Sequence, residues 1–151
     1  MKLQRLLALF LVVVLAFSTV SCNDDDDDDA EPTRTALLTG GQWTGTALYL
    51  GTQNISDWLI DEDDPDNSFD VRKWTVTFNS NGTYSSSYDG SAAESGRWEF
   101  TNNEQAILFD KGTADEETAT INRLTSTELY VVQPWETEDN QTVDIEARFA
   151  R

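Results

Sequence analysis

Residues 74–88 read WTVTFNSNGTYSSSY and predict two strands joined by a tight turn. Apolar and polar residues alternate between residues 72 and 78, which gives one strand face to Trp74, Val76 and Phe78. The NSNG sequence at 79–82 supplies the turn, because asparagine and glycine tolerate positive φ. Residues 83–88 then return along a second strand. A hairpin with one apolar face indicates an antiparallel sheet that covers a core.

The same alternation recurs along most of the remaining chain. The predicted strands span residues 43–50, 72–78, 83–88, 96–100, 106–110, 117–124, 128–133 and 142–149. The last alternates most cleanly and has on one face Val143, Ile145, Ala147 and Phe149. Nearly all of these strands are joined by short turns, which favours closure into a barrel over a Greek-key sandwich. The sequence therefore predicts an all-β fold, a small eight-stranded up-and-down antiparallel barrel.

One segment, residues 51–70, interrupts this pattern and is rich in Asp, Asn and Ser. Ser56 is a candidate N-cap for a short helix over residues 57–61, which would bury Trp58 and Leu59. We expect this insertion to form a lid over one end of the barrel. Its aspartates offer hard oxygen ligands, but they lack the spacing of an EF-hand loop, so we predict a solvated loop without a high-affinity calcium site.

The chain begins with the features of an export signal. Lys2 and Arg5 precede an apolar run at residues 6–17, which is too short for a membrane-spanning helix and fits the hydrophobic region of a signal peptide. Small residues lead to Cys22, which is the only cysteine and therefore forms no intrachain disulfide. This arrangement resembles a bacterial lipobox, so Cys22 is the predicted lipid-bearing N-terminus. The alternative is a plain signal peptide followed by a free thiol.

A run of aspartates follows the cysteine directly. A block of like charges stays extended and repels an anionic membrane surface, so it can act simply as a spacer. The run also resembles the export signal of Bacteroidota lipoproteins, which implies an outer-membrane protein that faces the cell exterior. The residues of this predicted signal are Asn23, Asp24, Asp25, Asp26, Asp27, Asp28 and Asp29. The predicted organisation is a signal peptide at 1–21, a lipidated tether at 22–35 and a barrel domain at 36–151.

Composition excludes several classes of function. The chain has 10 basic and 28 acidic residues, a net charge of −18, and no histidine. Such a balance is unsuited to nucleic acid, because the phosphate backbone is bound by basic surfaces. The folded part has neither histidine nor thiol, which excludes Ser-His-Asp and Cys-His catalysis and the usual zinc sites. We therefore predict a protein that is not an enzyme and that has no cofactor and no metal site.

Several short motifs resemble a known family. Gly41-Gln42-Trp43 resembles the G-x-W signature of lipocalins. The runs at 74–87, 95–100 and 119–132 are similar to the lipocalin-like domain common in Bacteroidota lipoproteins. The resemblance covers residues 37–149 and implies a lipocalin-like (calycin-like) barrel whose mouth holds an apolar or amphipathic ligand. The T-D-Y signature and the disulfide of typical lipocalins are absent.

This resemblance suggests site residues. The interior would be lined by Trp74, Tyr84, Trp98 and Phe100, either as ligand contacts or as side chains that simply fill the barrel. Gly41 and Trp43 would form a latch that closes the barrel base, with Arg148 or Arg123 stacked on Trp43.

Two functions remain open. The first is a lipid-anchored module that binds a small hydrophobic ligand. The second is a tethered accessory with a filled barrel, which docks on an envelope protein or a glycan. Exposed aromatic residues outside the strand pattern would favour the accessory, and the candidates are Trp58 and Trp135.

Overall fold

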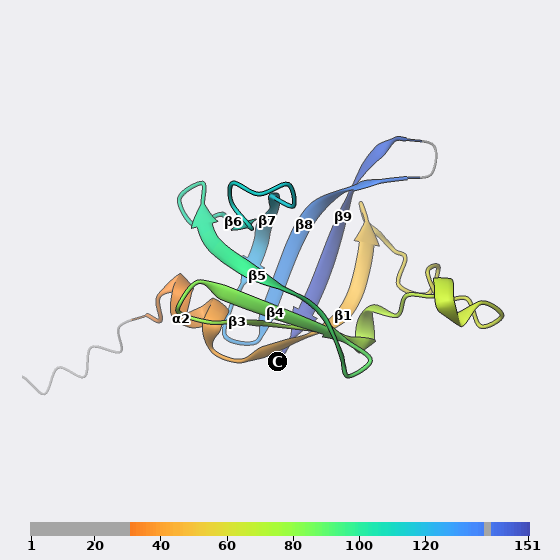
Figure 1. Ribbon diagram of the computed structural model, residues 1–151, viewed down its shortest axis with the longest axis horizontal. Coiled ribbons are helices and arrows are strands. Elements are labelled where there is room, and N and C mark those ends of the chain that lie inside the picture. The colour runs from red at the N-terminus through yellow and green to blue at the C-terminus, as the bar shows by residue number, and fades with distance from the viewer. Residues whose placement is uncertain (1–30, 138–139) are drawn as a thin grey trace, which may run out of the picture. The chain divides into compact units, whose positions relative to one another are not determined.

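The computed structural model describes residues 31–137 and 140–151, and Figure 1 shows their arrangement. The predictions for the signal peptide, Cys22 and residues 23–29 lie outside the described residues. A compact unit spans Pro32–Arg151. Its main strands are β1 (Gln42–Leu50), β3 (Trp74–Phe78), β4 (Thr83–Tyr88), β5 (Ser91–Thr101), β6 (Ala106–Phe109), β7 (Glu117–Leu124), β8 (Glu128–Glu136) and β9 (Thr142–Ala150).

These eight strands form a closed antiparallel barrel, as the sequence predicts. Each strand from β3 to β9 pairs with its neighbour in the chain. β1 closes the ring, because Trp43 pairs with Val76 of β3 and Leu48 pairs with Ala147 of β9. A two-residue strand, β2 (Gln53–Asn54), adds to the far end of β1 and was not predicted. The closed ring and its core lie within Pro32–Arg151, so this unit contains a complete fold.

The inward faces of the strands form the core. Its buried side chains are Leu38, Trp43, Leu48, Ile55, Val71, Val76, Phe78, Trp98, Ile107, Ala119, Leu129, Val131, Ala147 and Phe149. The predicted alternation in β3 and β9 is confirmed, since Val76, Phe78, Ala147 and Phe149 are all buried. At the first hairpin, Gly82 takes the positive φ that its turn requires.

A short helix, α2 (Arg34–Thr39), precedes the barrel and begins inside the segment predicted as a tether. Thr33 caps it by accepting a hydrogen bond from the Ala36 amide at 3.1 Å. Leu38 is fully buried and joins the core. Within the part of the chain that the structure describes, no helix has the length and apolar character needed to cross a membrane.

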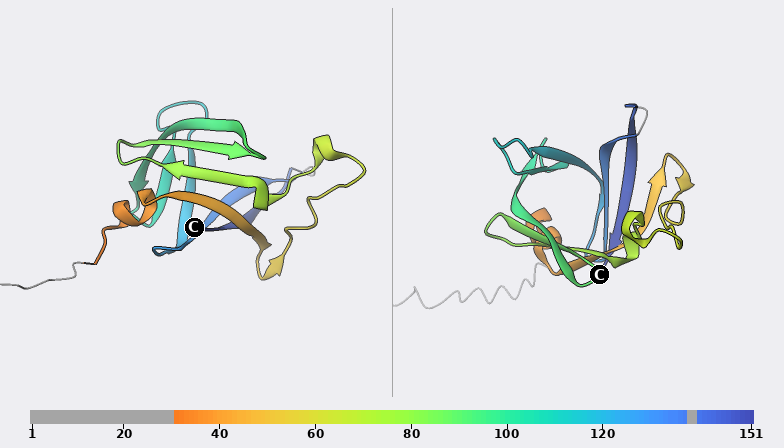
Figure 2. Two further views of the ribbon diagram at one scale, coloured as in Figure 1. Left: turned by 90° about the horizontal axis from the view of Figure 1, so that it is seen from below. Right: turned by 45° about the vertical axis from the view of Figure 1, so that its right-hand side comes forward.

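The insertion between β2 and β3 differs from the prediction. No helix forms at residues 57–61, which make a turn, and two short 3₁₀ helices follow, η1 (Pro65–Asn67) and η2 (Val71–Lys73). The expected helix cap is already engaged: the Ser56 hydroxyl accepts from the Leu48 amide and donates to Asn54 Oδ1. Trp58 is 61% exposed, and the buried residues of this segment are Ile55 and Ser56, which precede residues 57–61. Figure 2 shows the insertion standing to the side of the barrel, beyond β1.

Candidate functional site

The barrel has a closed base. Trp43 is completely buried there, and its indole N–H donates to the Leu38 carbonyl oxygen of α2 at 2.8 Å. Arg151 covers the Trp43 ring, with its guanidinium carbon 4.2 Å from the ring centre. Its Nε donates to the Ser126 carbonyl oxygen at 2.7 Å. A cation over an indole face is attracted by the ring quadrupole, so Arg151 holds the base shut.

The predicted partner of Trp43 was therefore the wrong arginine. Arg148 has the opposite parity to Phe149 on β9 and lies on the outer face, where its guanidinium carbon is 3.8 Å from the Tyr49 ring centre. Its Nε also donates to Glu146 at 2.7 Å. Arg123 pairs with Glu128. Gly41 lies beside the Arg151 side chain, with 3.6 Å between the position of an added Cβ and Arg151 Cδ.

The predicted lining residues pack on aromatic side chains of the interior, and two of them, Trp98 and Phe100, contact each other. Trp98 is 8% exposed, and its ring centre lies 5.6 Å from that of Phe78 and 5.3 Å from that of Phe100. Its indole N–H donates to the Asn79 carbonyl oxygen at 3.1 Å. Trp74 packs against Phe149 with 5.1 Å between ring centres. This part of the interior is filled by side chains.

The opposite end of the barrel is the mouth, where β1 ends, β4 turns into β5, β6 leads to β7, and β8 turns into β9. Here the β8–β9 hairpin extends past the other strands (Figure 1). Trp135 pairs with Val143, and Leu50 pairs with Ile145. Directly opposed residues share a sheet face, and Ile145 has the parity of the buried Ala147 and Phe149.

We call these four residues the apolar strip: Leu50, Trp135, Val143 and Ile145. Trp135 is 60% exposed and Leu50 is 38% exposed, so the strip continues the barrel interior into solvent. From its sequence context, Trp135 was predicted only to be an exposed aromatic residue. The predicted strand ended at residue 133. The pairing of β8 with β9 continues beyond it and places Trp135 on the inner face.

Polar groups occupy another side of the mouth. Tyr84 donates from its hydroxyl to Asp110 Oδ2 at 3.0 Å, and Asp110 Oδ1 accepts from the Arg97 amide at 2.8 Å. Burial and the Asp110 carboxylate raise the pKa of Tyr84. Gly96 makes room for this carboxylate, because a Cβ there would collide with Asp110.

Two glutamates also belong to this polar side. Glu117 pairs with Phe109, which itself pairs with Trp98, so Glu117 lies on the inner face. The Glu94 amide donates to the hydroxyl of the buried Ser86 at 3.1 Å. Burial, followed by the charge of Glu94, raises the pKa of Glu117. The alternation of residues along β7 could have placed Glu117 on the inner face. It was not recognised there, because a charged residue is not expected at an inward position.

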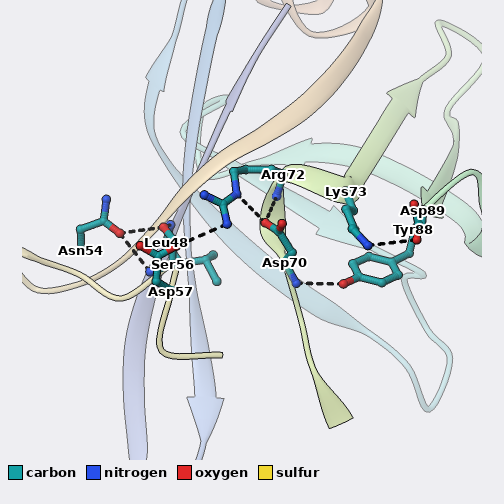
Figure 3. A network of polar contacts seen from close by, with 9 residues as sticks. All are labelled: Leu48, Asn54, Ser56, Asp57, Asp70, Arg72, Lys73, Tyr88 and Asp89. Carbon is teal, nitrogen blue, oxygen red and sulfur yellow. Dashed lines mark hydrogen bonds and ion pairs between the residues drawn. The ribbon is translucent and has the colours of Figure 1, made fainter. Parts of the chain in front are cut away.

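The insertion is anchored beside the mouth at both of its ends (Figure 3). At the start, Ser56 holds the Leu48 amide at 2.9 Å. At the end, Arg72 forms ion pairs with Asp70 at 2.7 Å and with Asp57 at 3.3 Å. The Asp70 amide donates to the Tyr88 hydroxyl at 2.8 Å.

This anchoring places one aromatic side chain of the insertion against the barrel. The Phe69 ring stacks on Tyr88 with 5.3 Å between ring centres and meets the edge of Trp74 at 6.1 Å. The insertion was expected to form a lid over one end of the barrel. Phe69 is the residue of the insertion that comes nearest to this role, because it packs against the barrel.

Other parts of the described surface are weaker candidates for a binding site. A hollow of about 480 Å³ is lined by Arg97, Glu99, Leu108 and Lys111 among others. Arg97, Glu99 and Leu108 alternate with the inward-facing Trp98 and Phe109 and so belong to the outer face, while Trp98 and Asp110 also line the hollow. The Lys111–Glu99 ion pair at 2.6 Å spans it. Among the described residues, no group of three or more carboxylates, thiols or imidazoles is placed to hold a metal ion.

Comparison with known proteins agrees with this architecture. A search of curated proteins found no match. The profile of the lipocalin-like domain matches residues 39–131, which run from the end of α2 into β8 and include the base tryptophan and most of the barrel. This match covers more than half of the chain, and the chain therefore belongs to the lipocalin-like domain family.

Proposed function

We propose that this protein is a lipoprotein anchored through Cys22 to the outer membrane, that it faces the cell exterior, and that its barrel holds a small hydrophobic ligand at the mouth. The apolar strip is the observation that carries the binding part of the proposal. An exposed tryptophan on the same inner face as Leu50, Val143 and Ile145 offers a contiguous apolar area of the kind that marks ligand-binding grooves.

The filled base limits how deep such a ligand can reach. Trp98, Phe78 and Phe100 pack edge to face and occupy the interior between base and mouth. The ligand therefore lies across the apolar strip and does not thread the barrel. Each buried methylene contributes roughly 0.8 kcal/mol, so an alkyl chain placed on this strip gains useful affinity without a deep cavity.

A matched pair of variants tests the site. Trp135 and Trp58 are exposed almost equally, 60% and 61%, but only Trp135 belongs to the strip. We expect Trp135→Ala to weaken binding of the neutral fluorophore N-phenyl-1-naphthylamine about tenfold, while Trp58→Ala leaves binding unchanged. Fluorescence titration measures both. Absence of binding by the wild type would remove the proposed ligand site.

The anchor has its own test. Cells that express the wild type and are fed an alkyne fatty acid should incorporate the label, and the Cys22→Ser variant should not. Equal labelling of the two proteins would show that Cys22 is not the acylated residue.

Surface exposure rests on the acidic run at 24–29 and is tested separately. Replacing these aspartates by serine and alanine should leave lipidation intact but protect the protein from protease added to whole cells. If protease digests the variant and the wild type equally, the run acts only as a spacer.

A second function is favoured by Trp58, which projects from an insertion that Arg72 ties down through Asp57. An exposed aromatic on an anchored loop is a typical contact for a protein or a glycan. In this case Trp58→Ala, and not Trp135→Ala, would abolish binding to an envelope protein or glycan, measured by cross-linking on whole cells.

A further inference from the structure

We infer that the barrel mouth selects amphiphiles with a cationic head over anionic amphiphiles such as fatty acids. This inference rests on the proposed ligand binding and adds the chemical class of the ligand. It follows from which charged side chains the strands direct inward.

Strand register assigns a face to each charged residue of the barrel. Among the described strands, the inward positions carry two charged residues, Glu117 and Glu94. Glu117 has the parity of the buried Ala119 on β7, and Glu94 has the parity of the buried Trp98 on β5.

The basic residues of the strands have the opposite parity. Arg97 lies next to the inward Trp98, and Arg148 lies next to the inward Phe149. Arg123 forms an ion pair with Glu128, and in the strand register it lies opposite Tyr130. No lysine or arginine of the described strands faces the interior. An anionic head in the mouth would therefore meet carboxylates without a compensating cation.

The two glutamates also influence the same neighbour. Glu94 contributes to the raised pKa of Glu117, and both contribute to that of Tyr84. Like charges that act on each other in a partly desolvated place are relieved by a bound cation. The Asp110 carboxylate, bound to Tyr84, adds a third negative charge at this side of the mouth.

The apolar strip supplies the other half of the recognition. An alkyl tail would lie along Leu50, Val143 and Ile145, which form one continuous face through the β1–β9 and β8–β9 pairings. Trp135 is exposed on the same face and can attract a quaternary ammonium group through its ring. Hydrocarbon and carboxylates that both line the inner face of the mouth fit a single-chain cationic amphiphile.

Overall charge must be separated from the charge of the mouth, because a chain of net charge −18 attracts every cation. The experiment therefore compares decyltrimethylammonium, decanol and decanoate, which share one tail, by calorimetric titration below their micelle concentrations. The protein is residues 31–151, which contain the complete barrel. We expect decyltrimethylammonium to bind at least about tenfold more tightly than decanoate, with decanol between them.

Two double variants with equal charge change locate the effect. Glu94→Gln with Glu117→Gln neutralises the inward pair, while Glu62→Gln with Glu104→Gln neutralises two exposed residues, one in the insertion and one in the β5–β6 turn at the base. The inward double variant should reduce the preference for the cation about tenfold, and the outer one should retain it. Circular dichroism confirms that each variant is folded.

Each outcome has a distinct meaning. Equal loss of preference in both double variants would show that overall charge, not the mouth, selects the cation, and would overturn the inference. Equal or tighter binding of decanoate would overturn it as well, while leaving hydrophobic ligand binding in place. If decanol and both ionic amphiphiles fail to bind, the proposed carrier function is wrong and the inference fails with it.

Discussion

Gly45 is the point at which β1 passes closest to η2. A Cβ added to Gly45 would collide with the Val71 carbonyl oxygen, and Val71 is itself fully buried. The register of β1 against β9 also shifts between Gly45 and Ala47. This glycine therefore permits β1 to bend under η2 while it continues to pair with β9, which keeps the ring closed.

A prediction follows for Gly45→Ala. The added methyl group meets backbone that cannot move without shifting η2, so we expect the free energy of unfolding to fall by roughly 1–3 kcal/mol. Urea unfolding followed by tryptophan fluorescence measures this. Gly41→Ala is the control, because its nearest neighbour lies 3.6 Å away and is a flexible arginine side chain. Equal stability of Gly45→Ala and the wild type would contradict the close approach.

Glu117 allows a prediction about pH. Burial and the charge of Glu94 raise the pKa of Glu117 above its ordinary value of 4.5. Ionisation of an acid whose pKa is raised by folding lowers the stability of the folded state above that pKa, and this cost disappears as pH falls below the unfolded value. Glu117→Gln should therefore raise the thermal midpoint at pH 7, and the difference from the wild type should vanish towards pH 4.

The control for this change is the exposed Glu62→Gln, which should leave the thermal midpoint where it is at both pH values. Thermal unfolding followed by circular dichroism gives the midpoints of the wild type and the two variants at both pH values. A lower midpoint for Glu117→Gln at pH 7 would mean that the carboxylate makes a favourable contact in the folded protein.

At the scale of elements, the insertion depends on a few polar contacts for its position. Arg72 joins its two ends by pairing with Asp57 and Asp70, and the side-chain hydrogen bond from Arg72 lowers the pKa of Asp70. Little apolar area supports the outer part, because Trp58 and Leu59 are exposed. Segments with few buried contacts open locally without global unfolding.

We expect Arg72→Ala to accelerate amide hydrogen exchange across residues 57–70 while the core strands keep their protection. Lys73→Ala is the matched control, since it removes a neighbouring ion pair, to Asp89, that does not involve Asp57 or Asp70. Exchange measured by mass spectrometry distinguishes the two variants. Unchanged exchange in Arg72→Ala would show that Ser56 and Phe69 alone hold the insertion.

Sequence alternation predicted the strands well where one face is buried. It gave the inward residues of β3 and β9, because burial of Val76, Phe78, Ala147 and Phe149 imposes a period of two. The same parity extends to Arg151, which therefore reaches Trp43 from the inner face. That contact was missed because the predicted strand ended at residue 149.

Local signals failed where tertiary contacts compete with them. Ser56 is a good helix cap in isolation, but its hydroxyl is engaged by Leu48 and Asn54. The predicted strand at 128–133 stopped before Pro134, yet β8 continues to Glu136. Proline is tolerated there because the pairing of β8 with β7 stops at Val132, so no partner on that side requires the missing amide. The mouth depends on this extension and could not be derived from the pattern.

At the scale of the whole molecule, the barrel separates stability from recognition along its length. The base is sealed by Trp43, Leu38 and Arg151, and the middle is packed with aromatic rings. On the barrel itself, the large apolar side chains exposed among the described residues are Trp135 and Leu50 at the mouth, while Trp58 and Leu59 are exposed on the insertion. A ligand that binds at the mouth would thus leave the core intact, and substitutions at the mouth should affect binding without unfolding the protein.

Two tryptophan truncations test this separation. Trp98→Ala removes a buried indole from contact with Phe78 and Phe100, and it removes one of the two hydrogen bonds that the Asn79 carbonyl oxygen accepts. We expect it to cost roughly 3–5 kcal/mol, a large share of the roughly 5–15 kcal/mol that stabilises a domain. Trp135→Ala removes an exposed indole and should leave the urea midpoint almost unchanged while it weakens binding of the neutral fluorophore.

Urea unfolding and fluorophore titration, performed on both variants, separate the alternatives. A small loss of stability in Trp98→Ala together with lost binding would mean that the middle of the barrel is an open pocket lined by Trp98. A large loss of stability in Trp135→Ala would mean that the hairpin is part of the folding core and that the strip is not free for a ligand. The packing of Trp98 and the exposure of Trp135 predict the opposite pattern, with stability residing in the middle of the barrel and binding at its mouth.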